Sequence, residues 1–310
     1  MTAPAAVAVS TVALVGGGVV ADRLRSVARD RYRFVGPDVS APIVVLASAG
    51  PHAELAAAYL ERGVHVVSTS GSSHDVRDLL ELDDAARAAG ASLVVGAAVS
   101  PGLSGLFARH LAASMSACDE LHVTVHGTAG PCCAREHHRS FRGWAIGWHD
   151  GRWIERPAGS GRELCWFPEP VGARDSYRAE MPDPWLLHRS FPGVGRISAR
   201  RSATRRDRVT ARLPMLSPPH REGGVGALRV EARGAAASGE RVTEVIGMAE
   251  LIGTAASAVA GAFVDLLARR GTAPGVVTAS DPDLPTTPLL AAVARAGVRL
   301  QAFTGIPHTG

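Results

Sequence analysis

The stretch TVALVGGGVVADRL, residues 11–24, restricts the possible folds of this chain more than any other segment. Residues 11–16 form an apolar run rich in β-branched side chains, which predicts a buried strand. Residues 18–30 then repeat apolar side chains at helical spacing among charged ones. A buried strand that passes through glycines directly into a helix is typical of the first unit of a parallel α/β sheet.

The glycines between this strand and this helix match a phosphate-binding turn. Residues 16–21 read Gly-Gly-Gly-Val-Val-Ala and fit G-x-G-x-x-[GA]. In such a turn the first glycine allows a tight bend, the second lets the backbone approach a pyrophosphate, and the helix N-terminus offers free N–H groups. We therefore expect a dinucleotide to bind here, with a purely structural glycine turn as the alternative. The expected cofactor-binding residues are Gly16, Gly17, Gly18, Val19 and Val20.

Strand and helix patterns continue to alternate as far as residue 116. Strands are predicted over 32–38, 43–48, 65–71 and 92–99, and helices over 52–62, 75–89 and 103–116. This order predicts an α/β protein with a Rossmann-like, doubly wound parallel sheet. The strand at 32–38 is followed almost at once by the next strand, which leaves no room for the usual helix and third strand of the first half.

Asp38 is the candidate for recognition of the cofactor ribose. An acidic residue after the second strand binds the ribose 2′-hydroxyl of NAD in this fold, and Asp38 follows Gly18 at a suitable distance in the sequence. Asp38 either fills that role or starts a turn after Pro37. Because Arg31 and Arg33 lie nearby, the expected cofactor is NAD or NADP.

A second domain begins near Cys118. Residues 121–127 alternate with period two, as a half-exposed strand does. Residues 226–236 and 240–251 predict an antiparallel strand pair, and residues 254–270 and 289–296 predict helices. The expected domains are a Rossmann-like domain over 1–117 and an α+β substrate domain over 118–274, with 275–310 packing back on the first.

Five short motifs occur in order between residues 47 and 113. They are Ala49-Gly50-Pro51, Gly63-Val64-His65-Val66-Val67, Ser70-Gly71, the helix end from Asp84 to Gly90, and Pro101-Gly102-Leu103-Ser104. In order and spacing they resemble the saccharopine dehydrogenase family. The resemblance implies a Rossmann domain and a substrate domain with NAD(P)(H) between them, and redox chemistry on an imine, carbonyl or enoyl group. It also implies that Ala49, Gly50 and Pro51 pass along the nicotinamide half, with Ser70, Gly71 and Pro101 nearby.

The sequence departs from that family on the substrate side. The family's Asp before the Ser/Thr-Gly turn and its Glu after the turn are Ser68 and Ser72 here. The family's Gly-Pro-Ser-x-Gly-Thr turn corresponds to residues 130–135, which read Gly-Pro-Cys-Cys-Ala-Arg. These departures favour a substrate from specialised biosynthesis over one from lysine metabolism.

Reactive side chains are concentrated in residues 127–144, GTAGPCCAREHHRSFRGW. One interpretation makes His137 or His138 a general acid, because the ordinary histidine pKa is close to neutral pH. A second makes Cys133 a nucleophile activated by a nearby histidine. A third treats the segment as a loop without catalytic residues. No metal site is predicted, because adjacent cysteines lack the spacing of zinc ligands.

Candidate substrate contacts lie in the same part of the chain. They are His126, Arg135 and Trp144. The tryptophans, all in the second domain, either line an apolar substrate pocket or fill that domain's core. The seven arginines from Arg196 to Arg212 either bind phosphate or carboxylate groups or belong to a solvated strand pair or loop.

The composition limits the other function classes. All 33 Lys and Arg residues are Arg, so no lysine can act as a base or form a Schiff base. No long uninterrupted apolar window and no nucleic-acid motif occur, so neither a membrane nor a nucleic acid is an expected partner. The four cysteines lack CxxC spacing, which favours reduced thiols in a cytoplasmic protein. The expected partner is a small-molecule substrate, and a homodimer is left open.

Taken together, the sequence predicts an enzyme, an NAD(P)-dependent oxidoreductase. The first alternative is a non-redox cyclase, isomerase or lyase that uses the Cys/His segment 132–138 on a degenerate dehydrogenase scaffold. The second alternative is a non-catalytic binding protein, because a fold does not by itself fix a function.

Overall fold

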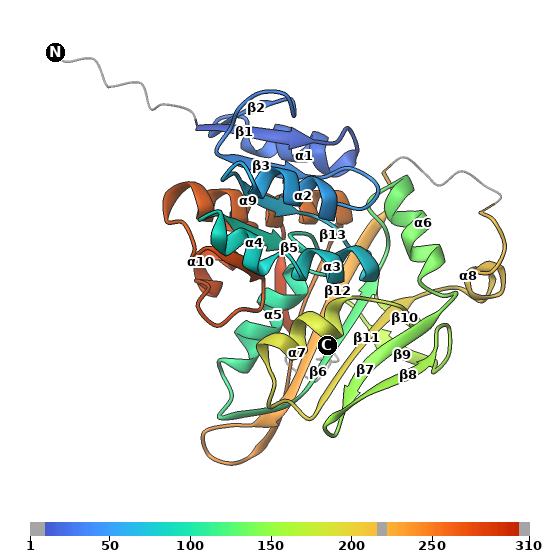
Figure 1. Ribbon diagram of the computed structural model, residues 1–310. Coiled ribbons are helices and arrows are strands. Elements are labelled where there is room, and N and C mark those ends of the chain that lie inside the picture. Colours follow the sequence, from blue (N-terminus) through green and yellow to red (C-terminus); the bar gives the residue numbers. More distant parts are fainter. Residues whose placement is uncertain (1–9, 216–221, 304–310) are drawn as a thin grey trace.

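The computed structural model describes residues 10–215 and 222–303, which form two β-sheets with helices around them (Figure 1). The first sheet has six strands in the order β14-β5-β4-β3-β1-β2, and all its pairs are parallel. Its strands are β1 (Ser10–Val15), β2 (Tyr32–Val35), β3 (Ile43–Leu46), β4 (His65–Ser68), β5 (Ser92–Val95) and β14 (Gly275–Thr278).

Apolar side chains cover both faces of this sheet, as parallel sheets require. Leu14 and Val45 pack on one face with helices α1, α5, α9 and α10, whereas Val44 and Leu46 pack on the other with α2, α3 and α4. The helices are α1 (Val19–Ala28), α2 (Ala53–Leu60), α3 (Ser73–Leu80), α4 (Asp83–Ala88), α5 (Leu103–Ala112), α9 (Ile252–Arg269) and α10 (Thr286–Arg295). The predicted α/β class with a doubly wound parallel sheet is confirmed.

The chain reverses direction across the sheet between β1 and β3. From β1 it runs outward to β2, at the sheet edge, and then returns to β3 on the other side of β1. Among the described residues no strand lies beyond β2, so the first half is short by one βα unit, as the sequence indicates. Ligands of open α/β sheets bind at such a reversal, outside the carboxyl ends of the strands.

The second sheet has nine strands and is mixed. Its main path is β15-β13-β12-β6-β11-β10-β9, in which β6 and β11 are parallel, and a branch formed by β7 and β8 pairs with the start of β11. The strands are β6 (Ala117–His126), β7 (Trp144–His149), β8 (Arg152–Pro157), β9 (Glu163–Trp166), β10 (Ala173–Arg178), β11 (Arg196–Ser202), β12 (Val225–Ala235), β13 (Arg241–Leu251) and β15 (Leu300–Phe303). Three further helices accompany it: α6 (Pro131–Arg139), α7 (Asp183–Ser190) and α8 (Arg205–Thr210).

Helix α9 connects the two sheets. It follows β13 of the second sheet directly and packs on α1 of the first (Figure 1). Among the described residues it is the one helix long and apolar enough to span a membrane, but 78% of that window is buried inside the protein. Its apolar surface is therefore used as core. After α9 the chain contributes β14 to the first sheet and β15 to the second.

Three sequence-based predictions need correction. The helix expected over 75–89 is two helices, α3 and α4, of which α4 begins at Asp83. The Asp83 carboxylate accepts a hydrogen bond from the Val276 N–H at 2.6 Å and so holds β14 in place. The supposed loop at 127–144 contains helix α6, which begins with Pro131 in its first turn, where a proline is tolerated. The arginine-rich segment is a strand and a short helix, β11 and α8, and not a strand pair.

Candidate functional site

The glycine turn lies at the carboxyl end of β1, at the reversal point of the first sheet. Gly16 has φ +133°, and a Cβ there would lie 2.6 Å from the Ala47 carbonyl, so only glycine fits against the end of β3. A Cβ at Gly17 or at Gly18 would meet nothing within 4 Å. Helix α1 starts next, with Gly18 at its N-cap and no side chain capping it. Open space and free N–H groups thus occur together, as a pyrophosphate site needs.

The other predicted cofactor residues lie at the carboxyl ends of the neighbouring strands. Ala49, Gly50 and Pro51 are exposed after β3, and Ser70 and Gly71 follow β4. Gly71 packs against the next turn, because a Cβ there would lie 3.6 Å from the Ser100 carbonyl oxygen and 3.9 Å from Pro101. These turns form a continuous row from β1 across β3 and β4 to β5.

The candidate ribose residue Asp38 lies on the opposite side of β1. It is exposed in the turn after β2, and Tyr59 donates a hydrogen bond to the Pro37 carbonyl oxygen there at 3.2 Å. Of the two nearby arginines, Arg31 is paired with Asp265 of α9. Arg33 is therefore the arginine left to bind a 2′-phosphate on the ribose. The predicted cofactor stays NAD or NADP.

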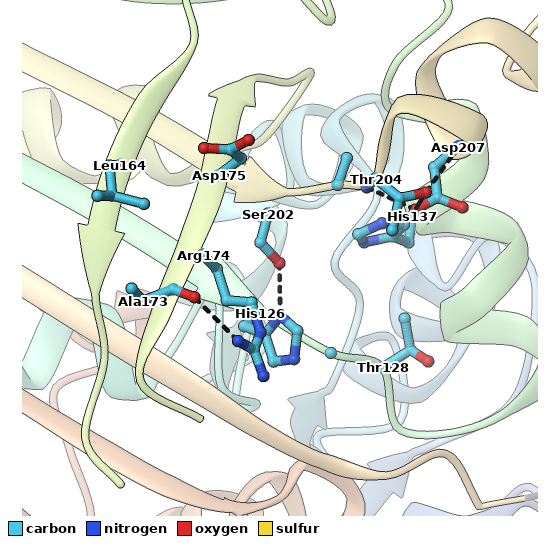
Figure 2. A pocket seen from close by; sticks show the side chains of 12 residues that line it. His126, Thr128, His137, Leu164, Ala173, Arg174, Asp175, Ser202, Thr204 and Asp207 are labelled. Carbon is cyan, nitrogen blue, oxygen red and sulfur yellow. Dashed lines mark hydrogen bonds between the residues drawn. The ribbon is translucent and has the colours of Figure 1, made fainter. Parts of the chain in front are cut away.

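The second sheet contributes a cavity of about 560 Å³ beside this row. It lies near the ends of β6 and β11, with β9 and β10 on one side and α6 and α8 on the other (Figure 2). Its volume is in the range of small-molecule sites. The lining residues are His126, Gly127, Thr128, His137, Leu164, Ala173, Arg174, Asp175, Ser202, Ala203, Thr204 and Asp207.

Packing around Gly253 connects the cavity to the glycine turn. A Cβ at Gly253, in the first turn of α9, would lie 2.5 Å from the Val19 side chain and 3.9 Å from the Ala129 carbonyl oxygen. Ala129 directly follows Thr128, which lines the cavity. The start of α1 and the edge of the cavity are therefore neighbours, although they belong to different sheets.

Two histidines, both predicted from the sequence, share this cavity. His126 lies 2.6 Å, Nδ1 to Oγ, from Ser202, and His137 lies near Thr204 and Asp207 (Figure 2). Neither ring nitrogen of His137 has a hydrogen-bond partner within the described ranges. The ring of His137 rests edge-on against Phe141, with 5.3 Å between centroids. This imidazole is held by packing while its nitrogens are left free for a ligand.

The environment of these histidines changes the role expected for them. Burial, together with the Arg201 charge, lowers the pKa of His137 to about 3. Burial and Arg174 also lower the pKa of His126. The expectation that His137 has a pKa suited to a charged general acid near neutral pH is therefore wrong. Both rings are therefore neutral at pH 7, and the lowered pKa makes each a weaker base than a free histidine.

A buried cation, Arg201, and a buried carboxylate, Asp183, lie outside the lining of the cavity. Arg201, on β11, is 5% exposed, its Nε has no hydrogen-bond partner, and it forms no ion pair within the described part of the chain. Asp183, at the start of α7, is 1% exposed and accepts hydrogen bonds from Ser100 at 2.7 Å and Ser104 at 2.6 Å. Burial raises the pKa of Asp183, although both serines and Arg201 oppose the shift. A buried N–H without a partner is costly, but the charge of Arg201 already interacts with the Asp183 carboxylate.

Other predicted site residues lie elsewhere. His138 and Arg135 line a separate, smaller cavity of about 280 Å³, and His138 is hydrogen-bonded to the Leu213 carbonyl oxygen at 2.9 Å. Cys133 is half-buried on α6 and lines neither cavity. Trp144 is 58% exposed at the start of β7. None of the five tryptophans lines the larger cavity, so the expected tryptophan pocket is not there.

Sequence reasoning missed much of the cavity. Thr204 and Asp207 form a capping box on α8, and the T-x-x-D spacing was a readable signal for it. Ser202 and Asp175 come from strands whose pairing brings distant segments together, which no local pattern shows. The burial of Arg201, among seven neighbouring arginines, likewise had no signal in the sequence.

Comparison with known proteins identifies the fold. No protein-family model and no curated protein matches the chain. A solved structure, saccharopine dehydrogenase (L-Glu forming) from Saccharomyces cerevisiae, matches with a TM-score of 0.65 and 12% identity over 95% of this chain and 99% of the other.

Two more distant structures are also similar. One is a mutant meso-dapdh from Clostridium tetani E88 with DAP, with a TM-score of 0.49 and 14% identity over 90% of this chain and 95% of the other. The other is a C. glutamicum DAP dehydrogenase in complex with DAP, with a TM-score of 0.48 and 13% identity over 91% and 96%. At these identities the similarity concerns the fold alone, and the conclusion about the fold rests on the yeast structure. The resemblance predicted from residues 47–113 is thus confirmed at that level: this chain has the fold of saccharopine dehydrogenase.

Proposed function

We propose that the protein is an NAD(P)-dependent oxidoreductase that acts on an imine, carbonyl or enoyl group of a small metabolite. The observation that carries this proposal is the position of Gly17 and Gly18. They leave open space at the start of α1, at the reversal point of the sheet, next to a cavity that contains two neutral histidines. The fold shared with saccharopine dehydrogenase supports the same function.

The row of strand-end turns fits an extended dinucleotide. The pyrophosphate would lie on the N–H groups at the start of α1, since anions are stabilised there. The adenosine half would then extend toward β2 and Asp38, and the nicotinamide half toward residues 49–51 and 70–71. When bound, NAD(P) supplies the hydride chemistry that no side chain of this protein can provide.

The chain itself would orient the substrate and move a proton. Neutral His137 can accept a proton from a bound alcohol or amine, and so can His126, whose ring contacts the Ser202 hydroxyl. Arg174, the arginine that lines the cavity, would pair with an anionic group of the substrate. The negative charge of that group would also raise the pKa of His137 toward the working range. A carboxylate-bearing substrate therefore fits this cavity best.

Cofactor titration tests this function. Wild-type protein is titrated with NADH and with NADPH by calorimetry and nicotinamide fluorescence, in parallel with a Gly18→Asp variant. We expect micromolar binding of at least one cofactor in the wild type and its loss in the variant. If folded wild-type protein binds neither cofactor, the proposal is wrong.

The non-redox alternative has little structural support in this cavity. It depends on the Cys/His segment 132–138, of whose cysteines and histidines only His137 lines the larger cavity, whereas Cys133 lines neither cavity and His138 faces the smaller one. The expected cytoplasmic location, the role in specialised biosynthesis and the homodimer remain predictions.

A further inference from the structure

A buried histidine joins two of the turns assigned above to the nicotinamide half. His52 is 1% exposed and precedes α2. Its Nδ1 lies 2.9 Å from Ser68 Oγ, and its Nε2 lies 3.2 Å from the Ser48 carbonyl oxygen. Ser48 follows β3 and Ser68 ends β4, so one imidazole bridges the carboxyl ends of two adjacent strands.

Nε2 of His52 lies 3.2 Å from the Ser48 carbonyl oxygen and 3.4 Å from Ser48 Oγ, and the shorter contact sets the direction of the hydrogen bonds around this ring. A carbonyl oxygen can only accept, so Nε2 carries the hydrogen and donates to Ser48. Nδ1 then accepts from the Ser68 hydroxyl, and Ser68 Oγ in turn accepts from the Ser70 N–H at 3.3 Å. Of the two neutral tautomers, only the Nε2–H form makes all three of these contacts. Turn 69–71 is thereby tied through His52 to turn 48–51.

The surroundings keep the ring neutral and its backbone fixed. Burial lowers the pKa of His52, although the Ser48 carbonyl and the Asp75 charge act in the opposite direction. Asp75, on α3, accepts hydrogen bonds from the N–H groups of His52 at 2.8 Å and Ala53 at 3.1 Å. His52 is therefore held through its ring by Ser48 and Ser68 and through its backbone N–H by Asp75.

We propose that His52 is a positioning residue for the cofactor, holding turns 48–51 and 69–71 at the separation that the nicotinamide half requires. This inference rests on the proposed function. It also gives a chemical reason for serine at position 68, where the resembling family has aspartate. A serine hydroxyl donates to a neutral imidazole, whereas a buried aspartate would draw a proton onto Nδ1 and create an imidazolium.

Two ligands separate a positioning role from a general structural one. NADH, or NADPH if it binds better, spans both halves of the site, whereas the matching ADP-ribose lacks the nicotinamide. Dissociation constants are measured by calorimetry for wild type, Ser68→Ala, His52→Leu and the double variant. Ser68→Thr, which keeps the hydroxyl, serves as the rescue variant. His110→Leu, at an exposed position of α5, is the matched control.

We expect Ser68→Ala and His52→Leu each to weaken dinucleotide binding about tenfold, because each breaks the same relay. The double variant should be no weaker than either single one, because the relay is lost only once. ADP-ribose binding should stay unchanged in all of them, and Ser68→Thr should restore the dinucleotide affinity. The His52 ring should give the Nε2–H pattern in ¹⁵N NMR spectra at pH 7, and an imidazolium pattern in Ser68→Asp.

The contrary results are equally specific. Unchanged dinucleotide affinity in folded Ser68→Ala protein, or an equal loss of ADP-ribose affinity, would overturn the positioning role. An Nδ1–H tautomer in the wild type would overturn the relay itself. If the wild type binds no dinucleotide at all, the proposed function fails and the inference fails with it, so the two failures can be told apart.

Discussion

The two sheets of this protein place their polar groups in opposite ways. In the six-stranded sheet, β3 and β5 are buried along their whole length, and the polar turns lie beyond the strand ends. In the nine-stranded sheet, polar side chains such as His126 and Arg201 project from the strands themselves. A parallel sheet covered on both faces can present chemistry only at its carboxyl edge. A mixed sheet is free of that limit, so the first sheet suits a cofactor and the second a substrate.

The largest expected effect is a loss of cofactor affinity at the first sheet. Gly18→Asp should weaken NADH or NADPH binding at least about a hundredfold, because a carboxylate would repel the pyrophosphate where the backbone now leaves open space. Calorimetry measures the affinity, and circular dichroism checks the fold. Gly193→Asp, at an exposed glycine of the second domain that also has nothing nearby, is the matched control and should bind normally.

The next effect belongs to the second sheet's cavity. His137→Gln should lower kcat/KM about a hundredfold by removing the proton acceptor, while cofactor affinity stays the same. The neighbouring His138→Gln variant should change kcat/KM only slightly, because His138 lies outside this cavity. Steady-state kinetics with the identified substrate measure both. Equal losses in the two variants would mean that helix α6 as a whole is needed, and not one imidazole.

Arg174, the arginine that lines the cavity, gives a smaller effect. Arg174→Met should raise KM about thirtyfold by removing the partner of an anionic substrate group. The free energy of unfolding should be nearly unchanged, because the Arg174 side chain is exposed. Kinetics and urea denaturation measure the two quantities. An Arg174→Met protein that keeps its KM would contradict the pairing.

The contact of Asp183 with Ser100 and Ser104, which joins the two domains, should affect the free energy of unfolding. Asp183→Ala should lower the free energy of unfolding by about 2 kcal/mol, since it leaves the Ser100 and Ser104 hydroxyls without their acceptor. Asp183→Asn, which keeps an acceptor oxygen, should cost less. Cofactor affinity should change little in either variant. Chemical denaturation gives the ordering, and a larger cost for Asn than for Ala would contradict it.

The last expected effect is a pH dependence of stability. The pKa of His137 is about 3 in the folded state, below its ordinary value of 6.5, so the unfolded chain binds more protons between these values. His137 therefore contributes stability above pH 6.5 that is lost as the pH falls toward 3. His137→Gln should flatten the fall in unfolding free energy over this window. A profile identical to wild type would show that His137 is solvated.

The same contrast between the two sheets explains which features could be predicted from the sequence. Five strands of the first sheet and its glycine turn were predictable, because the strands are apolar runs and the turn has a local pattern. The sixth strand, β14, was not predicted. The cavity was only partly predictable. His126 and His137 could be proposed from residue type, but the register that brings Ser202 and Asp175 to them joins segments far apart in the chain. The lowered pKa of His137 depends first on its burial and then on Arg201, and no local pattern shows either one.

Hydrogen exchange with and without cofactor tests the division between the sheets most directly. Wild-type protein is exchanged alone and with saturating NADH or NADPH, and peptides are followed by mass spectrometry. We predict that protection will concentrate in residues 16–21, 47–53 and 68–72, at the carboxyl edge of the first sheet, with little change in β9 and β10. Protection confined to the second sheet, or none at all despite saturating cofactor, would contradict the account.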